Sequence, residues 1–284
     1  MAGFADLNIT GAGAGRERVT NAIALASRRT GMDFAYLLGQ AKIESSLNPT
    51  AKAQTSSATG LYQFIDQSWL GVINEHGSKY GLGWAADAIS QSPSGRYYVS
   101  DPQLRQQILD LRKHPETASV MAAEHAADNK AYLESRLGRQ AQPVDLYLAH
   151  FLGVGGAAKF LSAHDRNPNA AAASLFPSAA GANRPVFYDR AGNARSFAEI
   201  RSNFAAKLEK GVQGAMGSTG LNWAARGDDD DFADTMPANQ TVQPADYVRV
   251  ETDRLQQSIS AEDMIRPQPQ TARLAYLMLA TYGR

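Results

Sequence analysis

Apolar residues recur at the spacing of an α-helix through most of this chain, whereas the alternation typical of β-strands is scarce. The best strand candidate is 185–188, which the turn residues at 189–193 would make into a small hairpin or leave as an ordered loop. We therefore predict an all-α fold, or an α fold with a minor β-hairpin. Helices are expected at residues 17–29, 33–46, 66–75, 102–112, 116–137, 143–150, 155–163 and 196–209.

Composition divides the chain into three parts. Residues 1–16 are rich in Gly and Ala and are expected to form a flexible N-terminus, while the helical patterns predict a single domain at 17–210. Residues 211–284 carry a net charge of −4, against +4 for the rest of the chain. Their run of Asp at 228–231 is typical of an acidic linker or a disordered segment.

Two further helical patterns lie in the C-terminal segment. A modest helix is expected at 245–258. Residues 274–280 are apolar around most of a helix, and such a helix would be unstable if left in water. We expect 274–280 to dock on the body of the protein; a protein partner and a shallow membrane contact are the alternatives.

Several classes of function are disfavoured by composition. The chain has no Cys, which excludes disulfides and thiolate metal sites, and its five His residues show no close ligand spacing, so neither a metal nor a cofactor is predicted. No Lys/Arg cluster indicates a nucleic-acid partner. No apolar run reaches the roughly 20 residues of a membrane span. No secretory signal is visible, so we expect either a removed export peptide or another route of export.

An acidic residue falls on the apolar face of the helix predicted at 33–46. Helical residues advance by about 100° each, so Glu44 lies only about 20° from Leu37 around the axis. Burial disfavours the charged form of a carboxyl group, so an inward Glu44 would be able to give up a proton. The alternative is a solvated glutamate in the last turn, which is the commoner situation for an isolated Glu. The apolar face consists of Phe34, Leu37, Leu38 and Ala41.

The residues around Glu44 form a longer motif. Glu44 and Ser45 are followed by Asn48 and Pro49, and then by the sequence GLYQ at 60–63. With this motif the chain resembles the catalytic domain of the soluble lytic transglycosylases, relatives of goose-type lysozyme, in which an ES pair and an NP precede GLMQ. The resemblance is good over 31–70 and extends over roughly 20–165. It implies a lysozyme-like helical domain, followed here by a C-terminal tail.

The resemblance also implies an activity. These enzymes cleave the bond between N-acetylmuramic acid and N-acetylglucosamine in peptidoglycan and leave a 1,6-anhydro sugar. Glu44 would act first as acid and then as base, and the partner would be a peptidoglycan strand, which is anionic and compatible with the mildly basic body. A periplasmic or cell-wall location is expected. The residues expected to bind substrate are Ser45, Ser57, Gly60, Leu61, Tyr62, Gln63, Tyr147 and His150.

Departures from the family pattern leave some of these roles open. The stretch between the glutamate and GLYQ is one residue longer, so a hydroxyl near the acid would come from Ser56 or Ser57. The family's AYNxGxG motif corresponds to 149–155, where His150 and Phe151 replace Tyr and Asn. His150 either substitutes for the polar contact or packs between helices, and Tyr147 is a second candidate.

Other residues have side chains or backbone suited to related roles. Gly60 would allow a close backbone approach, and the Gln63 amide would bind an acetamido or hydroxyl group. The glycines at 153–156 fit a tight turn between helices better than a nucleotide site. Aromatic residues able to stack on sugars, although each is more often core, are Trp69, Trp84, Tyr97 and Tyr98.

Two alternative functions remain open from the sequence. A lysozyme-type muramidase would use water and need a positioned base, for which Asp66 and Glu124 are the nearest candidates. An inactive peptidoglycan-binding module would keep the cleft and recruit an assembly partner through its acidic tail.

Overall fold

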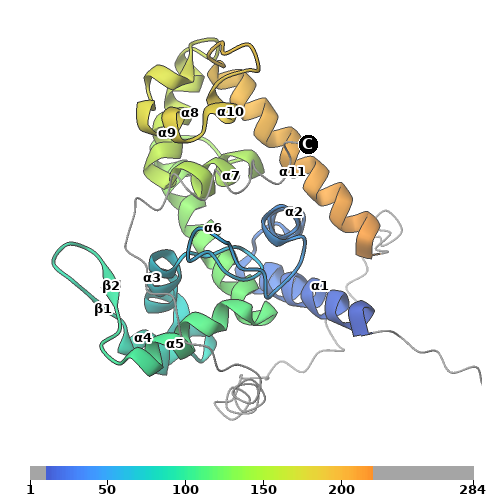
Figure 1. The fold of residues 1–284 in the computed structure, drawn as a ribbon, viewed down its shortest axis with the longest axis vertical. Helices are drawn as coiled ribbons and strands as arrows, with labels where there is room; N and C mark the ends of the chain where they lie inside the picture. Colours follow the sequence, from blue (N-terminus) through green and yellow to red (C-terminus); the bar gives the residue numbers. More distant parts are fainter. Residues whose placement is uncertain (1–10, 220–284) are drawn as a thin grey trace, which may run out of the picture.

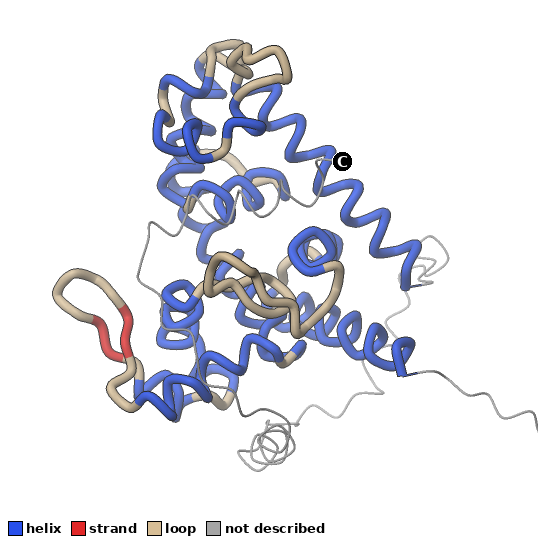
Figure 2. The backbone as a smooth tube through the Cα atoms, in the orientation of Figure 1, coloured by secondary structure: helices blue, strands red, loops and turns tan. Residues whose placement is uncertain are grey.

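The computed structural model describes residues 11–219, and this part of the chain is predominantly helical with one small antiparallel sheet (Figure 1, Figure 2). The predicted helical fold class with a minor hairpin is therefore confirmed. The helices predicted at 245–258 and 274–280 lie outside the described residues. In chain order the elements are α1 (Gly11–Thr30), α2 (Phe34–Ser45), α3 (Asp66–His76), η1 (Gly77–Tyr80), α4 (Gly83–Ala88), β1 (Ser90–Gln91), β2 (Tyr97–Tyr98), α5 (Pro102–Asp110), η2 (Leu111–Lys113), α6 (Pro115–Leu137), α7 (Pro143–Leu152), α8 (Val154–Arg166), η3 (Ala172–Ser174), α9 (Pro177–Ala182), α10 (Arg184–Phe187) and α11 (Phe197–Thr219).

All eight predicted helical segments are present, but two of them are longer than predicted. Helix α1 begins at Gly11 rather than near residue 17, and α11 continues to Thr219, past the predicted boundary at 210. Glycine has a low helix propensity, so the glycines at both places predicted that the helices would end there. In α11, Gly211 and Ala215 are buried in the fold, and this packing overrides the local preference.

At 185–188, where the sequence left a small hairpin or an ordered loop open, the hairpin alternative is wrong. The sheet pairs β1 with β2, with Gln91 opposite Tyr97. Residues 184–187 form the short helix α10, with Pro185 in its first turn. The turn that follows is held by Asp189, whose side chain accepts hydrogen bonds from Asn193, and an isolated bridge between Tyr188 and Ala194 closes it. That bridge is the only β-type pairing this segment shows within residues 11–219.

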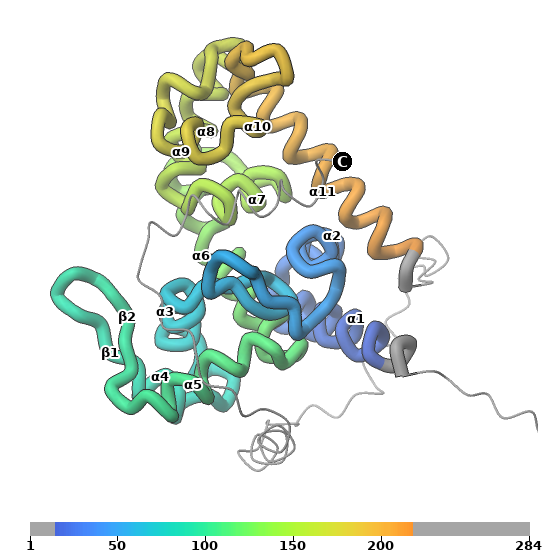
Figure 3. The backbone as a smooth tube through the Cα atoms, in the orientation of Figure 1, coloured from blue at the N-terminus to red at the C-terminus, as the bar shows by residue number. Residues whose placement is uncertain are grey.

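The long helix α6 lies at the centre of the fold. Helix α1 packs along its N-terminal half, α3 contacts it from another side, and α8 packs near its C-terminal end (Figure 1). Residues such as Met121 and Ala123 on α6 are fully buried. Helix α11 runs from the α8–α10 region past α7 to α2, as the colour sequence in Figure 3 makes visible. Residues far apart in the sequence therefore meet at α2.

Helix α2 begins and ends at defined local structures. The Asp33 side chain accepts a hydrogen bond from the Tyr36 amide at 2.6 Å, which satisfies a free donor of the first turn. At the other end, Ser46 and Leu47 both have left-handed φ angles, of 55° and 65°. This backbone turns the chain out of the helix directly after Glu44 and Ser45, into a loop that returns to α3 at residue 66.

The loop between α2 and α3 is a small ordered unit. Isolated bridges join Thr59 to Lys52 and to Phe64. Gly60 has a φ of 85°, and a Cβ placed on it would lie 2.0 Å from the carbonyl oxygen of Arg112, so only glycine fits there. The loop therefore packs closely against η2, and this contact fixes its position beside the end of α2.

Within residues 11–219, none of the helices combines the length and the apolar character required to cross a membrane.

Candidate active site

Glu44 points into the protein from the last turn of α2. Its side chain is only 2% exposed. Leu37, which precedes it by seven residues on the same face, is fully buried. The helical periodicity therefore predicted the direction of this side chain correctly, and the solvated alternative is wrong.

His150 on α7 lies within ion-pair distance of Glu44. Its Nε2 atom lies 3.2 Å from Glu44 Oε1. Neither of these two buried atoms has a well-aligned hydrogen-bond partner within residues 11–219. Catalytic hydrogen bonds are commonly long or poorly aligned until substrate binds. The pair is thus at contact distance and has unused hydrogen-bonding capacity.

The opposite nitrogen of His150 is held by Gln40, one turn before Glu44 on α2. Gln40 Nε2 and His150 Nδ1 are 3.3 Å apart. An amide nitrogen only donates, so this contact is a hydrogen bond when Nδ1 is the acceptor, and a neutral ring then carries its proton on Nε2, the nitrogen nearer Glu44. Tyr147 stacks on the same imidazole, with ring centroids 6.2 Å apart and an interplanar angle of 18°.

Ser45 and Gln63 use their polar groups to hold the loop. The Ser45 hydroxyl lies 2.8 Å from the carbonyl oxygen of Leu61, to which it donates. The Gln63 amide nitrogen donates to the carbonyl oxygens of Gly60, at 2.9 Å, and Ala51, at 3.2 Å. The amide donor that we expected to meet a sugar is therefore engaged inside the loop.

Gly60 and Leu61 shape the site without presenting side chains to it. The close backbone approach expected at Gly60 exists, but the approaching group is the carbonyl of Arg112 within the same chain. The Leu61 side chain is fully buried in the core. The prediction that the Leu61 side chain contacts substrate is therefore wrong.

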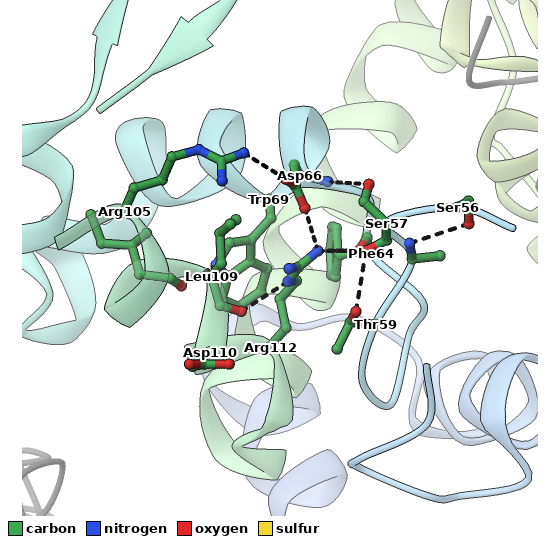
Figure 4. Close-up of polar contacts among 12 residues, drawn as sticks. Ser56, Ser57, Thr59, Phe64, Asp66, Trp69, Arg105, Leu109, Asp110 and Arg112 are labelled. Atoms are coloured by element: carbon green, nitrogen blue, oxygen red, sulfur yellow. Dashed lines mark hydrogen bonds and ion pairs between the residues drawn. The ribbon is translucent and has the colours of Figure 1, made fainter. Parts of the chain in front are cut away.

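Ser56 and Ser57 both bind backbone amides. The Ser56 hydroxyl accepts from Ala58, and the Ser57 hydroxyl accepts from the amide of Asp66 at the first residue of α3. Figure 4 shows both serines in the polar cluster around Arg112. Their hydroxyls order the loop, and nothing in the contacts of Ser57 directs its hydroxyl to Glu44.

Arg112, a residue of η2, holds the loop through hydrogen bonds of its buried side chain. Its guanidinium is buried and donates to the carbonyl oxygens of Ser57 and Phe64, and to Asp66 at 2.9 Å (Figure 4). Asp66 also binds Arg105 at 2.6 Å. Both carboxylate oxygens of Asp66 are therefore occupied by arginines, so Asp66 is not free to position a water molecule.

Glu124, the other candidate base, is likewise occupied. It accepts hydrogen bonds from Lys79 and from the Tyr80 hydroxyl, and His76 Nδ1 lies 3.6 Å away. Burial raises the pKa of Glu124, but the hydrogen bonds from Lys79 and Tyr80 outweigh it and hold this pKa below the ordinary value. A carboxylate paired in this way is a structural group rather than a poised base.

A small pocket lies beside His150. Its polar lining comes from α2, the loop, α6 and α7, and the Gln40 Oε1 atom has no hydrogen-bond partner within the described chain. Burial raises the pKa of both Tyr36 and Tyr62, so their phenols stay neutral. Burial also lowers the pKa of His125 to about 4. The groups Tyr36, Gln40, Tyr62, His125 and Asn129 are therefore neutral polar neighbours of His150 in the lining.

Lys207 on α11 is a charged neighbour that the sequence analysis missed. Its Nζ atom lies 5.7 Å from the ring centroid of Tyr147. Burial lowers the pKa of Lys207, and the charge of Glu44 opposes this shift. The only sequence signal was its position next to Leu208 in the 196–209 pattern, which places it at the edge of the buried face of that helix.

The aromatic residues divide between core and surface. Trp69 is fully buried and donates to the carbonyl oxygen of Ile108, so it is not a sugar platform. Tyr97 packs near Gly71 of α3. Trp84 and Tyr98 are partly exposed, at 36% and 46%. The turn predicted at 153–156 is shorter than expected, because Gly153, with a φ of 73°, alone separates α7 from α8 and residues 154–156 belong to α8.

A scan of the sequence against models of protein families finds no match.

Proposed function

We propose that this protein is a peptidoglycan lytic transglycosylase that uses Glu44 as its one acid and base, and that it acts at the cell wall. The observation that carries the proposal is the buried Glu44 carboxyl, 2% exposed, with His150 Nε2 at 3.2 Å. The motif shared with the soluble lytic transglycosylases supports the same assignment.

In the proposed reaction one carboxyl group serves twice. Protonated Glu44 donates to the glycosidic oxygen as the bond from that oxygen to the anomeric carbon breaks. The resulting carboxylate takes the proton of the muramic acid 6-hydroxyl while that oxygen bonds to the anomeric carbon. Glu44 is protonated again at the end, and no water is consumed.

This chemistry suits the charges around the site better than hydrolysis does. Glycosidases that use water normally employ two carboxyl groups at the scissile bond. Of the two acids expected for that role, Asp66 forms ion pairs with Arg105 and Arg112. Glu124 accepts hydrogen bonds from Lys79 and Tyr80. A nucleophile supplied by the substrate itself removes the need for a second free carboxylate.

The test is the variant Glu44→Gln, which keeps the shape of the side chain and removes its proton. We expect loss of product release by a factor of about 10² or more, since a general acid typically contributes 10²–10⁴. Products from sacculi are weighed by mass spectrometry. The matched control, Glu209→Gln on the exposed side of α11, should retain wild-type turnover.

The product masses separate the alternatives. Anhydro products from the wild type support the proposal, whereas products heavier by one water would assign a muramidase. Binding to sacculi without any turnover by the wild type would assign a glycan-binding module. Undiminished turnover by Glu44→Gln would refute the role of Glu44.

A further inference from the structure

Gln40 is the residue on α2 that fixes how His150 faces Glu44. It lies one helical turn before Glu44, is only 5% exposed, and its amide nitrogen is 3.3 Å from His150 Nδ1. The imidazole therefore sits between two side chains of the same helix, with Gln40 at one ring nitrogen and Glu44 at the other. Such an arrangement couples the tautomer of the ring to the amide of Gln40.

We propose that Gln40 is a positioning residue that holds His150 as the neutral tautomer with its proton on Nε2, and thereby presents a neutral N–H donor to Glu44. The proposal rests on the proposed function for its catalytic consequence. Its structural part, the location of the proton on the ring, stands independently of any turnover.

Glu44 acts first as an acid and then as a base, and this sequence requires a hydrogen-bond donor beside it that carries no charge. A cationic imidazolium at 3.2 Å would favour ionised Glu44 and remove the proton needed in the first step. With the opposite tautomer, a bare nitrogen lone pair would face the carboxylate that forms after proton donation. The neutral Nε2–H donor avoids both situations, because it stabilises the carboxylate without supplying a full charge.

The surroundings of the pair are consistent with a neutral ring. Tyr36 from α2 and Tyr62 from the loop are phenols, and His125 from α6 is a buried imidazole in the same pocket. Tyr147 stacks on the ring from within α7. Lys207 from α11 is a positive group near Glu44 and Tyr147.

The tautomer is measured directly by ¹⁵N NMR of the full chain at neutral pH, since protonated and bare ring nitrogens give separate signals. In the wild type we expect His150 to carry its proton on Nε2 alone. Gln40→Met keeps the side-chain length and removes the donor, so a population with the proton on Nδ1 should appear. Gln40→Glu places an acceptor at Nδ1 and should draw a proton to that nitrogen.

Turnover should depend on which ring nitrogen of His150 carries the proton. We expect anhydro-product release to fall by about tenfold in Gln40→Met and further in Gln40→Glu, with the pH dependence of turnover displaced in Gln40→Glu. Gln107→Glu, an exposed position on α5, is the charge-matched control and should leave both the His150 signals and turnover unchanged. Circular dichroism establishes that each variant is folded.

The outcomes distinguish this inference from the assigned activity. A proton on Nδ1, or on both ring nitrogens, in the wild type at neutral pH overturns the proposal. Unchanged ring signals in Gln40→Met overturn it as well, even if Gln40→Glu fails to fold. Should the ring respond as expected while the wild type releases no anhydro sugar, the positioning by Gln40 stands and the transglycosylase assignment falls.

Discussion

His125 shows how burial acts on a single side chain next to the proposed site. It lines the pocket with His150, and its ring meets Phe64 edge-on, with centroids 6.1 Å apart. Burial is the main reason for its lowered pKa of about 4, and the nearby His150 lowers it further. An imidazole in this position contributes to packing only while it is uncharged.

This side chain should make stability depend on pH. The unfolded chain binds a proton at His125 near pH 6.5, whereas the folded chain binds it only near pH 4. The free energy of unfolding should therefore fall as pH is lowered from 6.5 to 4, by up to about 3 kcal/mol from this residue. In His125→Gln this part of the fall should be absent. Urea unfolding at pH 7 and pH 4 measures it, and parallel losses in the two proteins would contradict the prediction.

At the scale of elements, the contact between α2 and α11 depends on two glycines. A Cβ on Gly211 would lie 2.9 Å from the carbonyl oxygen of Gly39 and 2.8 Å from the Ile43 side chain. A Cβ on Gly39 would lie 2.7 Å from Val212. The helices approach this closely because both side chains are missing, and the approach brings Lys207 towards Glu44.

Gly211→Val should force these helices apart. Overpacking of this kind costs roughly 1–3 kcal/mol of unfolding free energy, and the displaced α11 should also lower turnover. Gly217→Val on the same helix meets no atom within 4 Å and is the matched control. Thermal unfolding and product release are compared for both variants. Equal melting temperatures would show that the close contact is not needed.

For the whole molecule, α11 is the element that completes the core. Phe204 packs against Tyr147 and Phe151, with ring centroids 5.5 and 5.0 Å apart. Other buried residues of this helix are Phe197, Ile200, Leu208 and Ala215. Its apolar face therefore covers α2 and α7, which carry Glu44 and His150.

Two shortened chains test this arrangement. A chain ending at residue 196 lacks α11 and should lose cooperative unfolding, because burial of a large apolar side chain is worth about 1.5–3 kcal/mol and several are removed together. A chain ending at residue 219 keeps α11 and should retain the helical core. Denaturant unfolding measures both. Cooperative unfolding of the chain ending at 196 would contradict the role of α11.

The same comparison tests the prediction for the tail. Docking of 274–280 on the body predicts a lower free energy of unfolding for the chain ending at 219 than for the full chain. Identical values would reject that docking.

The sequence alone determined eight of the helical segments and the inward direction of Glu44, because both depend on a local period of 3.6 residues that neighbouring apolar side chains reveal. It also predicted the turn at Gly153. Only the tertiary structure decided that Gln40 and Glu44 contact opposite nitrogens of His150 and that Lys207 approaches them. It also decided that the Gln63 amide forms its hydrogen bonds within its own loop. These contacts join segments distant in sequence, and they depend on how closely helices such as α2 and α11 pack, which no local pattern specifies.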